Sequence, residues 1–583
     1  MRAHLLLLLL GVIVWARSIH GSFVNYDTPW LVIENPLLSG GDPSIAPAIF
    51  TDLSLSTRLL LGAEYLPIRD LSVLADFAVF GTSWWGHHTH NLLWYLLSCG
   101  LLLSVFQTLL KDDRKAWLAA AVYMVHPLHV ESVSWLASRK DVISLAFFFA
   151  SILGWLRGGW RWGVASVFCL GLAYWSKNTA ITLPAVLVVL SLLHARQSPL
   201  RLRWWLQWIP YGLLALLGLA LTFHVGGMVS MLSPVRADSA WGVLTIEVQV
   251  IGRYLRMIVA PYGLSVRYPE PEVASLIAPM FLFGLAALGG LLASAAALCR
   301  ARPVVSLGIL WFFITLLPVS QIVPIQNLIA DRYLLIPSAG LILAAVSCLP
   351  ASLLRKPAGV AAAAGILLTL SAATWQRSAV WHSSQALWAD LVEKNPADPY
   401  GWTSLIGVAV EDGRLDDADL LVGQGLTVLP DEASLLQSRG IVAMKRGKLA
   451  DAEEAFVEAL ILDPDLRKSR YNLMLSLDGQ GRSEAAVEVG RALVSEHPLY
   501  EAAWNGLGAV YIDLGQPEAA QAALEEAYAL NPYSVSTNTN LGNAAFLLGD
   551  SVSAEGWWRA VLRLEPGNDY ARRGLKALGA TDL

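Results

Sequence analysis

Asp27 is the acidic residue whose position in the chain best suits a role in catalysis. It lies in the segment FVNYDTPWLVIENPLL, residues 23–38, a few residues after the first apolar stretch and hence near a membrane surface. A carboxylate in such a place can act as a general base on a hydroxyl group, or can orient that group. The alternative role is structural, because Asp before Thr28-Pro29 often caps a turn. Spacing alone favours this structural role.

His126 and His129 stand three residues apart, close to Glu131, in the polar segment VHPLHVESVSWLASRKDVIS, residues 125–144. Two histidines and a carboxylate at this spacing could bind a metal ion from one face of a helix. Pro127 interrupts the backbone between them, however, and such groups near a membrane interface often satisfy one another. We therefore expect no divalent metal, and we interpret these three residues as support for a neighbouring site.

A set of cations and tyrosines lies in segments that we place on the outer face of the membrane. Cations retained on that face suit an anion such as a lipid phosphate, although interfacial snorkelling is an alternative. Arg332 has a planar fork that fits a phosphate diester, but the adjacent Asp331 could simply neutralise it. The candidate phosphate-binding residues are Arg139, Lys177, Arg332, Tyr333 and Tyr254.

Several classes of function are disfavoured by what the sequence lacks. It has no P-loop, no Rossmann glycine fingerprint, no nucleophile elbow and no HExxH zinc helix, so soluble nucleotide chemistry is not expected. The net charge of -5 comes without any basic run interleaved with aromatic residues, so we expect no nucleic-acid partner. All the cysteines lie in apolar segments, as small core residues do, at Cys99, Cys169, Cys299 and Cys348.

The first two thirds of the chain have the composition of a polytopic membrane protein. The sequence is 55% hydrophobic, and the excess is concentrated before residue 375. Stretches that approach the roughly 20 apolar residues of a membrane span are 4–16, 90–110, 116–128, 141–156, 162–176, 179–193, 204–225, 273–298, 304–319, 335–354 and 358–374.

The basic residues between these stretches predict the orientation, because short cytoplasmic loops carry an excess of Lys and Arg. The clusters of basic residues all fall on one side of the membrane if the stretch 244–260 does not fully cross it. We therefore interpret 226–272 as an outer loop with a re-entrant or surface helix. Arg2 then lies inside and the C-terminal third outside. A cleaved signal peptide at the start would give the same sidedness; we favour an anchor. The absence of Asn-x-Ser/Thr sequons favours a bacterial inner membrane, with the C-terminal third in the periplasm.

Prolines at a constant interval of 34 residues predict tetratricopeptide repeats (TPRs) in the last third. They are Pro396, Pro430, Pro464, Pro498, Pro532 and Pro566. The expected fold is therefore all-α, with a membrane domain at 1–374, a linker helix at 375–398, five repeats at 399–568 and a capping helix at 569–583. Stacked repeats form a groove that commonly receives extended peptide.

Asparagines in that groove are candidates for binding an acceptor peptide. Asn472 and Asn540 occupy the same position of their repeats, and Asn505 is one position away. A ladder of this kind could contact peptide backbone, whereas the alternative is ordinary solvated helix surface.

The order of motifs along the chain resembles the transmembrane and tetratricopeptide repeat-containing (TMTC) family. The segments are FVNYDTPWLVIENP, YLPIRDLSVLADFAVFG followed by HHTHNLLWYLL, VHPLHVESVSWLASRKDVIS, YWSKNTAITLPAVLVVL, RYLRMIVAPYGLSVRYP and DRYLLIPSAGLIL. The resemblance covers essentially the whole chain, since that family also ends in a TPR array.

The resemblance implies a GT-C type glycosyltransferase. Such enzymes pass a sugar from a polyprenyl-phosphate donor, here best taken as mannose, to an acceptor on the outer face, and TMTC members are associated with O-mannosylation of protein Ser/Thr. By this resemblance Asp27 becomes the catalytic acid-base candidate. The family often has two adjacent acids there, whereas Thr28 follows Asp27 in this chain, so a paired mechanism would need Glu34 or Glu131 as a substitute.

The mechanism that these residues imply is one direct displacement with inversion at the sugar carbon, in which Arg139, Lys177 and Arg332 offset the charge on the departing phosphate. Two other functions stay open. One is an envelope glycosyltransferase or ligase whose acceptor is a glycan or lipid, and the other is a non-enzymatic membrane scaffold that recruits partners through the TPR array.

Overall fold

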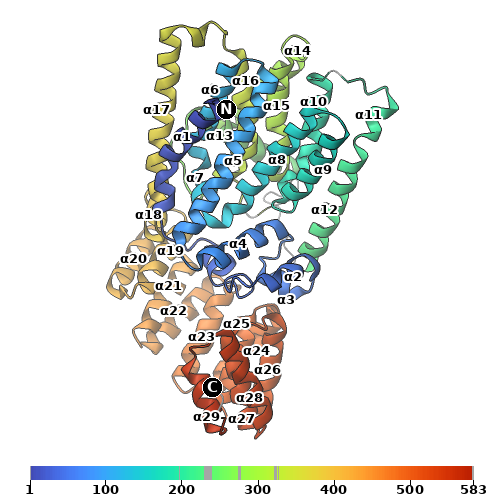
Figure 1. The fold of residues 1–583 in the computed structure, drawn as a ribbon. Helices are drawn as coiled ribbons and strands as arrows, with labels where there is room; N and C mark the ends of the chain where they lie inside the picture. Colours follow the sequence, from blue (N-terminus) through green and yellow to red (C-terminus); the bar gives the residue numbers. More distant parts are fainter. Residues whose placement is uncertain are drawn as a thin grey trace. The chain divides into compact units, whose positions relative to one another are not determined.

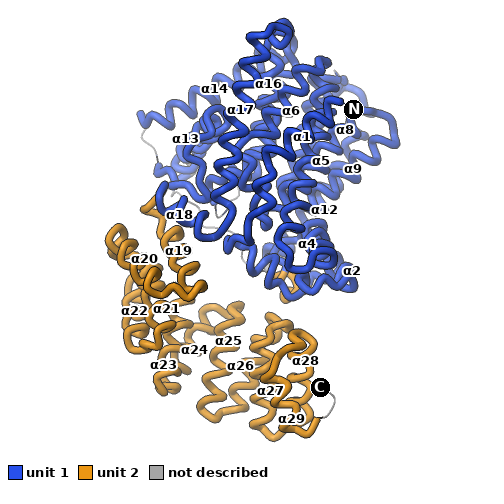
Figure 2. The backbone as a smooth tube through the Cα atoms, turned by 60° about the vertical axis from the view of Figure 1, so that its left-hand side comes forward, with its two compact units in different colours: residues 1–53, 61–394 blue, residues 54–60, 395–583 orange. Residues whose placement is uncertain are grey.

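The computed structural model describes residues 2–195, 197–228, 239–273, 277–320, 325 and 327–580. Helices dominate this part of the chain, and no β-strand occurs in it. The chain divides into two compact units, one made of Met1–Leu53 and Leu61–Lys394 and the other of Ser54–Leu60 and Asn395–Leu583 (Figure 2). Arg196, one of the basic residues behind the predicted orientation, lies outside the described residues.

The first unit is a bundle of helices of very different lengths (Figure 1). Its helices are α1 (Arg2–Trp15), α2 (Ala46–Thr51), α4 (Pro67–Phe80), α5 (Trp84–Leu110), α6 (Asp113–Met124), α7 (Val130–Ser134), α8 (Arg139–Arg157), α9 (Trp160–Tyr174), α10 (Leu183–Leu193), α11 (Leu202–Leu206), α12 (Ile209–Met228), α13 (Ala240–Val259), α14 (Pro279–Leu298), α15 (Pro303–Leu316), α16 (Leu335–Cys348), α17 (Pro357–Val380) and α18 (Ser384–Lys394).

Local sequence signals begin several of these helices. The carboxylate of Asp112 caps α6 by accepting the backbone N–H groups of Arg114 and Lys115 at 3.0 and 3.2 Å, as an N-cap aspartate does. Proline stands in the first turn of α14, α15 and α17, where its missing N–H costs no helical hydrogen bond.

Close helix packing places α15 directly against α16. A Cβ atom at Gly308 would lie 2.3 Å from the carbonyl oxygen of Gly340, and one at Gly340 would lie 2.5 Å from that of Gly308. Only glycine leaves room for backbones this close. The rings of Phe148 and Phe149 on α8 pack against Trp311 of α15, with centroids 6.0 and 6.2 Å apart, so α8 joins the same core.

Six helices of the described part are long and apolar enough to cross a membrane. They are Arg2–His20, Trp84–Leu110, Leu202–Gly227, Pro279–Leu298, Asp331–Cys348 and Pro357–Val380. The predicted all-α fold with transmembrane helices is confirmed, and the chain is an integral membrane protein. Most of the remaining predicted stretches form helices that are too short to count as candidate spans. Helix α8 is long enough, but it begins with the charged residues Arg139, Lys140 and Asp141.

The stretch 244–260 lies in α13, which is followed by an extended segment that runs back along it. The side-chain amide of Gln249 donates to the carbonyl oxygen of Glu272 at 3.0 Å, and Arg253 donates to that of Pro269 at 3.0 Å. The later residue of the helix thus meets the earlier residue of the segment, so α13 and 260–272 form a hairpin.

The second unit contains α3 (Leu55–Leu60) and an array of helical hairpins. The hairpin helices are α19 (Pro399–Glu411), α20 (Leu415–Val428), α21 (Ala433–Lys445), α22 (Leu449–Leu462), α23 (Arg467–Gly479), α24 (Ser483–Glu496), α25 (Glu501–Asp513), α26 (Pro517–Leu530), α27 (Val535–Leu547) and α28 (Ser551–Leu564), and α29 (Asp569–Ala577) follows them.

Each hairpin turn uses a glycine with positive φ, at Gly413, Gly447, Gly481, Gly515 and Gly549. Glycine adopts this conformation without the steric cost that a Cβ atom adds. The second helix of every hairpin ends two residues before one of the periodic prolines, as at Val428 and Pro430. The predicted TPR solenoid is therefore confirmed. The predicted linker, 375–398, is made of the end of α17, helix α18 and the residues up to the start of α19.

Candidate functional site

Asp27 has a strained backbone in the first loop. Its φ is +56°, a left-handed value that is uncommon outside glycine and that concentrates at functional positions. The side chain is half-buried and accepts one hydrogen bond, from the indole N–H of Trp30 at 3.3 Å. No cation lies within ion-pair distance of this carboxylate in the described part of the chain, so it is available as a base or for orienting a hydroxyl.

Tyr26, the residue before Asp27, links the first loop to Trp135 and Arg332. Its ring stacks on Trp135 with centroids 4.6 Å apart and planes at 20°, and its carbonyl oxygen accepts the indole N–H of Trp135. The guanidinium carbon of Arg332 in turn lies 5.3 Å from the centre of the Trp135 ring, a cation–π distance. A chain of direct contacts thus runs from the residue beside Asp27 to Arg332.

Arg332 is held by Glu131 and not by its neighbour Asp331. Glu131 accepts the Nη1 group of Arg332 through one carboxylate oxygen and the backbone N–H of Arg332, at 3.0 Å, through the other. Asp331 instead accepts the hydroxyl of Tyr268. Glu131 is buried, so this pair fixes Arg332 in a region of low water content.

Lys177 is held in the same way by Asp141. The ammonium group binds one carboxylate oxygen of Asp141, and the other oxygen accepts the hydroxyl of Ser138 at 3.0 Å. Burial lowers the pKa of Lys177, while the charge of Asp141 acts in the opposite direction.

A small cavity, with a volume of about 20 Å³, brings Lys177 and Arg332 to a common wall. Its lining combines polar residues, namely Asp141, Lys177, Thr179, Thr315, Arg332 and Tyr333, with apolar residues that include Val319, Ile336 and Pro337. Three of the predicted phosphate-binding residues, Lys177, Arg332 and Tyr333, therefore meet here. The apolar part of the lining comes from α16 and from Val319, which follows α15.

Arg139 does not line this cavity. It is buried and pairs with Asp76 of α4, and its Nη2 group donates to the carbonyl oxygen of His87 at 2.7 Å. His87 and His90 of α5 also contact Asp76. Burial alone would raise the pKa of Asp76, but the hydrogen bonds of the two histidines and the charge of Arg139 hold it well below its usual range. This second ionic cluster braces α4 against α5 and α8.

A third group of charges joins the buried Arg69 and Asp70 of α4 to the partly exposed Glu64 and Lys140. Glu64 accepts Lys140 at 2.8 Å and Arg69 at 3.1 Å, and Arg69 also donates to Asp70 at 2.7 Å. Tyr254 is likewise outside the cavity, because its ring is buried in an apolar cluster with Leu128 and Phe312.

The predicted supporting residues have partners of their own. His126 contacts the carbonyl oxygen of Ile258 at 2.9 Å, while His129 contacts the hydroxyls of Tyr95 at 2.8 Å and Ser338 at 3.1 Å. In the described ranges no group of three or more His, Cys, Asp or Glu residues could hold a metal ion. Glu34 is exposed and close to the first-loop turn, with its backbone N–H bonded to Pro29 at 2.7 Å.

The candidate asparagines of the TPR array lie on the first helices of successive hairpins. The Nδ2 group of Asn540 on α27 donates to Oδ1 of Asn505 on α25 at 3.0 Å, and Asn505 donates to Ser536 at 3.3 Å. Asn472 on α23 is half-buried and makes no hydrogen bond with other described residues. Two of the three predicted residues are thus connected.

The sequence predictions missed Asp141, Trp135 and Tyr26. Each lies inside a motif already noted, because Tyr26 precedes Asp27 and the other two flank Arg139 and Lys140. The sequence signal that could have found them was an aromatic residue or an acid close to a candidate cation. The pairing of Asp141 with Lys177, however, joins residues 36 positions apart and is visible only in the fold.

Fold and site together define an integral membrane protein that carries buried charge clusters beside its apolar helices and a TPR array. A tetratricopeptide repeat family model matches residues 438–501, 471–534 and 505–569. Human protein O-mannosyl-transferase TMTC2 is 30% identical over 135 residues, which is 22% of this chain and 16% of that protein.

Two longer matches extend over most of the chain. Protein O-mannosyl-transferase F38B6.6 of Caenorhabditis elegans is 23% identical over 478 residues, 79% of this chain and 62% of that protein. Protein O-mannosyl-transferase Tmtc3 of Drosophila melanogaster is 24% identical over 556 residues, 78% of this chain and 59% of that protein. The chain therefore spans less than two thirds of the length of these relatives.

These matches confirm the resemblance to the TMTC family with TPR repeats that the sequence motifs indicated. Among solved structures, the crystal structure of YrrB, a TPR protein with an unusual peptide-binding site, aligns with a TM-score of 0.27 at 15% identity, covering 32% of this chain and 97% of that one.

Proposed function

We propose that this protein is a membrane glycosyltransferase that moves a sugar, with mannose the first choice, from a polyprenyl-phosphate donor to a Ser or Thr hydroxyl of a protein. Residues 1–374 are the catalytic domain in this proposal, and residues 399–568 bind the acceptor. The relatives, which are named as protein O-mannosyl-transferases, support the reaction class. The observation that carries the proposal is the cavity where Lys177 and Arg332 meet Val319 and apolar residues of α16.

The two cations suit the phosphate of the donor. Arg332 uses Nη1 for Glu131, and a guanidinium has five N–H donors, so others remain for phosphate oxygens. The ammonium of Lys177 has three donors, of which Asp141 takes one. Glu131 and Asp141 therefore orient the cations in advance, and the cations need no rearrangement when negative charge develops on the departing phosphate.

The apolar residues beside the two cations suit contact with the polyprenyl chain. Val319 and Ile336 line it together with the charged residues, and Ile336 lies in the candidate span Asp331–Cys348. A lipid phosphate could therefore reach the cations from the membrane interface while its tail stays beside apolar helices. A soluble nucleotide sugar has no tail to place there.

Asp27 is the base in the proposed reaction. The acceptor oxygen forms a bond to the anomeric carbon while the bond from that carbon to the donor phosphate oxygen breaks. The electron pair of the broken bond leaves with the phosphate, beside Lys177 and Arg332, and the proton of the acceptor hydroxyl passes to Asp27. A single displacement inverts the anomeric configuration. Glu131 is engaged with Arg332, so Glu34 is the remaining acid that could pair with Asp27 in function.

The proposed orientation places this chemistry outside the cytoplasm. The basic clusters of the sequence then face the cytoplasm, and the first loop, Lys177 and Arg332 face the periplasm of a bacterial inner membrane. The acceptor peptide lies along the TPR groove, where Asn472, Asn505 and Asn540 offer side-chain amides to its backbone.

The test is sugar transfer in proteoliposomes that contain the purified protein, an acceptor protein and either polyprenyl-phosphate mannose or a nucleotide-linked mannose, each radiolabelled. We expect label on Ser or Thr only from the lipid-linked donor, with inverted anomeric configuration. Transfer from the nucleotide donor, or a product with retained configuration, would overturn the mechanism. Label that enters lipid or glycan but no protein would favour the alternative acceptor class.

A further inference from the structure

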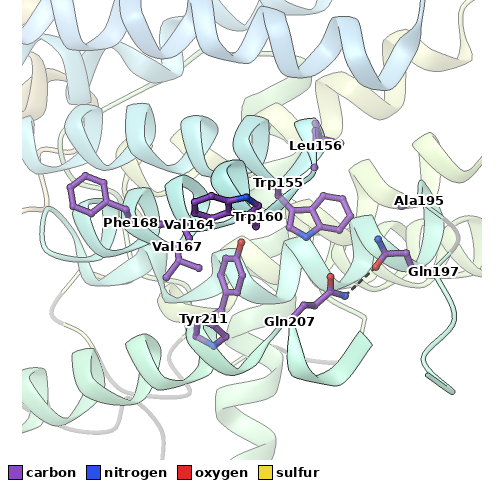
Figure 3. Close-up of a pocket in the computed structure, with 14 residues that line it drawn as sticks. Trp155, Leu156, Trp160, Val164, Val167, Phe168, Ala195, Gln197, Gln207 and Tyr211 are labelled. Carbon is purple, nitrogen blue, oxygen red and sulfur yellow. Dashed lines mark hydrogen bonds between the residues drawn. The ribbon is translucent and has the colours of Figure 1, made fainter. Parts of the chain in front are cut away.

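A large cavity lies at the other end of α9 from Lys177, outside the site described above. Its volume is about 810 Å³, within the range of about 300–1,000 Å³ that is usual for ligand sites. It is lined by residues of α8, α9 and α12 and by Ala195, Gln197 and Gln207 of the connecting segments (Figure 3). Helix α9 has 15 residues and begins at Trp160, at the cavity. Because a helix rises 1.5 Å per residue, the length of α9 separates the cavity from the Lys177 end by roughly 22 Å.

The walls of this cavity are apolar and aromatic along α9. Trp160, Val164, Val167 and Phe168 line one side, and Tyr211 of α12 faces them (Figure 3). The helical stretch from Trp160 to Phe168 is roughly 12 Å long. The hydrocarbon core of a bilayer is about 30 Å thick, so this length covers most of the depth of one leaflet. The hydroxyl of Tyr211 is engaged with Ser166 at 2.8 Å.

Two arginines lie next to lining residues in the sequence, where α8 ends and α9 begins: Arg157 stands between Leu156 and Gly158, and Arg161 follows Trp160. The guanidinium carbon of Arg157 lies 4.3 Å from the ring centre of Trp162, and that of Arg161 lies 5.5 Å from the ring centre of Trp160. Neither arginine has a carboxylate within ion-pair distance among the residues that the structure describes. Trp160 is 76% exposed, as expected of an interfacial anchor.

A buried donor without a partner lies next to this cavity. Trp208 stacks on Trp155, with centroids 6.3 Å apart, and contacts Tyr211. Its indole N–H is buried and makes no hydrogen bond within the described ranges, although such groups are nearly always satisfied in native proteins. Trp208 lies beside the cavity and is not part of its lining.

We propose that this cavity is a binding site for an anionic phospholipid, with one acyl chain between α9 and α12 and the phosphate beside Arg157 and Arg161. The apolar length, the two uncompensated guanidinium groups and the tryptophans at the start of α9 each match one part of that molecule. Basic pockets between membrane helices bind anionic head groups in this way. Because the cavity lies at the opposite end of α9 from Lys177, it opens to the other leaflet, where bulk phospholipid is the available lipid.

Gly163 offers a way to fill the cavity without disturbing the protein. It lines the cavity, and a Cβ atom there would meet nothing within 4 Å. Gly163→Leu should therefore occupy the acyl-chain position. Gly365 on α17 is a matched control, because it is a helical glycine with equally open surroundings that does not line the cavity.

The experiment is native mass spectrometry of the full-length protein in neutral detergent with equal amounts of phosphatidylglycerol and phosphatidylcholine. We expect wild type and Gly365→Leu to retain phosphatidylglycerol about tenfold more than phosphatidylcholine, an effect of the size that two arginines near a head group give. Arg157→Gln combined with Arg161→Gln should reduce that preference to within about twofold. Gly163→Leu should lose both lipids while eluting as the same monodisperse species in size exclusion.

Three results would overturn the proposal. They are equal retention of the two lipids by wild type, wild-type retention of phosphatidylglycerol by Gly163→Leu, and displacement of phosphatidylglycerol by an equal amount of polyprenyl phosphate. The last result would assign the cavity to the lipid that we propose as sugar donor. The arginine variants leave the acyl-chain walls intact, so they test the head-group contact even if Gly163→Leu folds poorly.

Discussion

At the scale of single residues, the cations of the proposed site are each paired with a carboxylate from a distant part of the chain. Glu131 holds Arg332, and Asp141 holds Lys177. Removing one partner of a buried pair leaves a charge without compensation, which is far more costly than breaking an exposed pair. The stability of the protein should therefore depend strongly on carboxylates that the proposed reaction uses only to position cations.

Glu131→Gln should lower the free energy of unfolding by about 3–5 kcal/mol, because it leaves the guanidinium of Arg332 buried and unpaired. The measurement is thermal unfolding of the purified protein in detergent. Glu458→Gln is the control, since Glu458 pairs with Arg439 on the TPR surface and both side chains are about 40% exposed, at 43% and 39%. That change should cost less than about 1 kcal/mol. Equal stability losses in the two variants would show that the Glu131 pair is not buried in solution.

The candidate residues were recognised from the sequence to different degrees. Lys177, Arg332 and Tyr333 were singled out and do share one cavity, because cations in otherwise apolar surroundings stand out in a membrane protein. Arg139 was grouped with them, but it pairs with Asp76. Sequence order gave no means to separate the two clusters, since an ion pair between residues 63 positions apart depends on how α4, α5 and α8 pack.

At the scale of elements, the hairpin of α13 and its return segment depends on a close approach to α14. A Cβ atom at Gly284 of α14 would lie 2.0 Å from the carbonyl oxygen of Val248, and one at Gly252 would lie 3.1 Å from the Cα atom of Gly284. The sequence predicted that 244–260 would be helical and would not cross the membrane fully. It could not predict this approach, because the small residues that permit it are also common where no contact occurs.

Gly284→Ala should destabilise the protein by about 1–3 kcal/mol, because the new methyl group forces α13 away from α14. Gly289→Ala on the same helix meets nothing within 4 Å and should be neutral or stabilise by up to about 1 kcal/mol through helix propensity. Thermal unfolding in detergent compares the two variants. A Gly284→Ala protein as stable as Gly289→Ala would contradict the packing of this hairpin.

At the scale of the whole molecule, the two units were predictable for different reasons. The 34-residue period defines each TPR hairpin locally, with a glycine turn and a proline after every second helix, so the array could be derived residue by residue. The membrane unit has no such repeat. Its apolar stretches were located, but within the described residues six helices reach the length and apolar character of a span, because charges and breaks near loops shorten the others.

The proposed division of labour predicts that the TPR array controls acceptor binding and not the chemical step. Replacing Asn505 and Asn540 with Ala in the full-length chain should raise the KM for a protein acceptor about tenfold, since each lost hydrogen bond is worth about 0.5–1.5 kcal/mol. The kcat should stay within about twofold. Gln521→Ala, an exposed change on the second helix of a hairpin, is the control. An unchanged KM in the Asn variant would favour a lipid or glycan acceptor.

The central claim is that Asp27 performs the chemistry of sugar transfer next to a lipid phosphate held by Lys177 and Arg332. The most direct measurement is single-turnover transfer of labelled mannose from polyprenyl-phosphate mannose by wild type, Asp27→Asn and Asp42→Asn, with donor binding measured on the same samples. Asp42 is an exposed first-loop acid that caps Ser44 at 2.9 Å, and asparagine caps equally well. The account predicts that Asp27→Asn binds donor normally but transfers at least about 100-fold more slowly, while Asp42→Asn matches wild type. Transfer by a well-folded Asp27→Asn protein at the wild-type rate would contradict it.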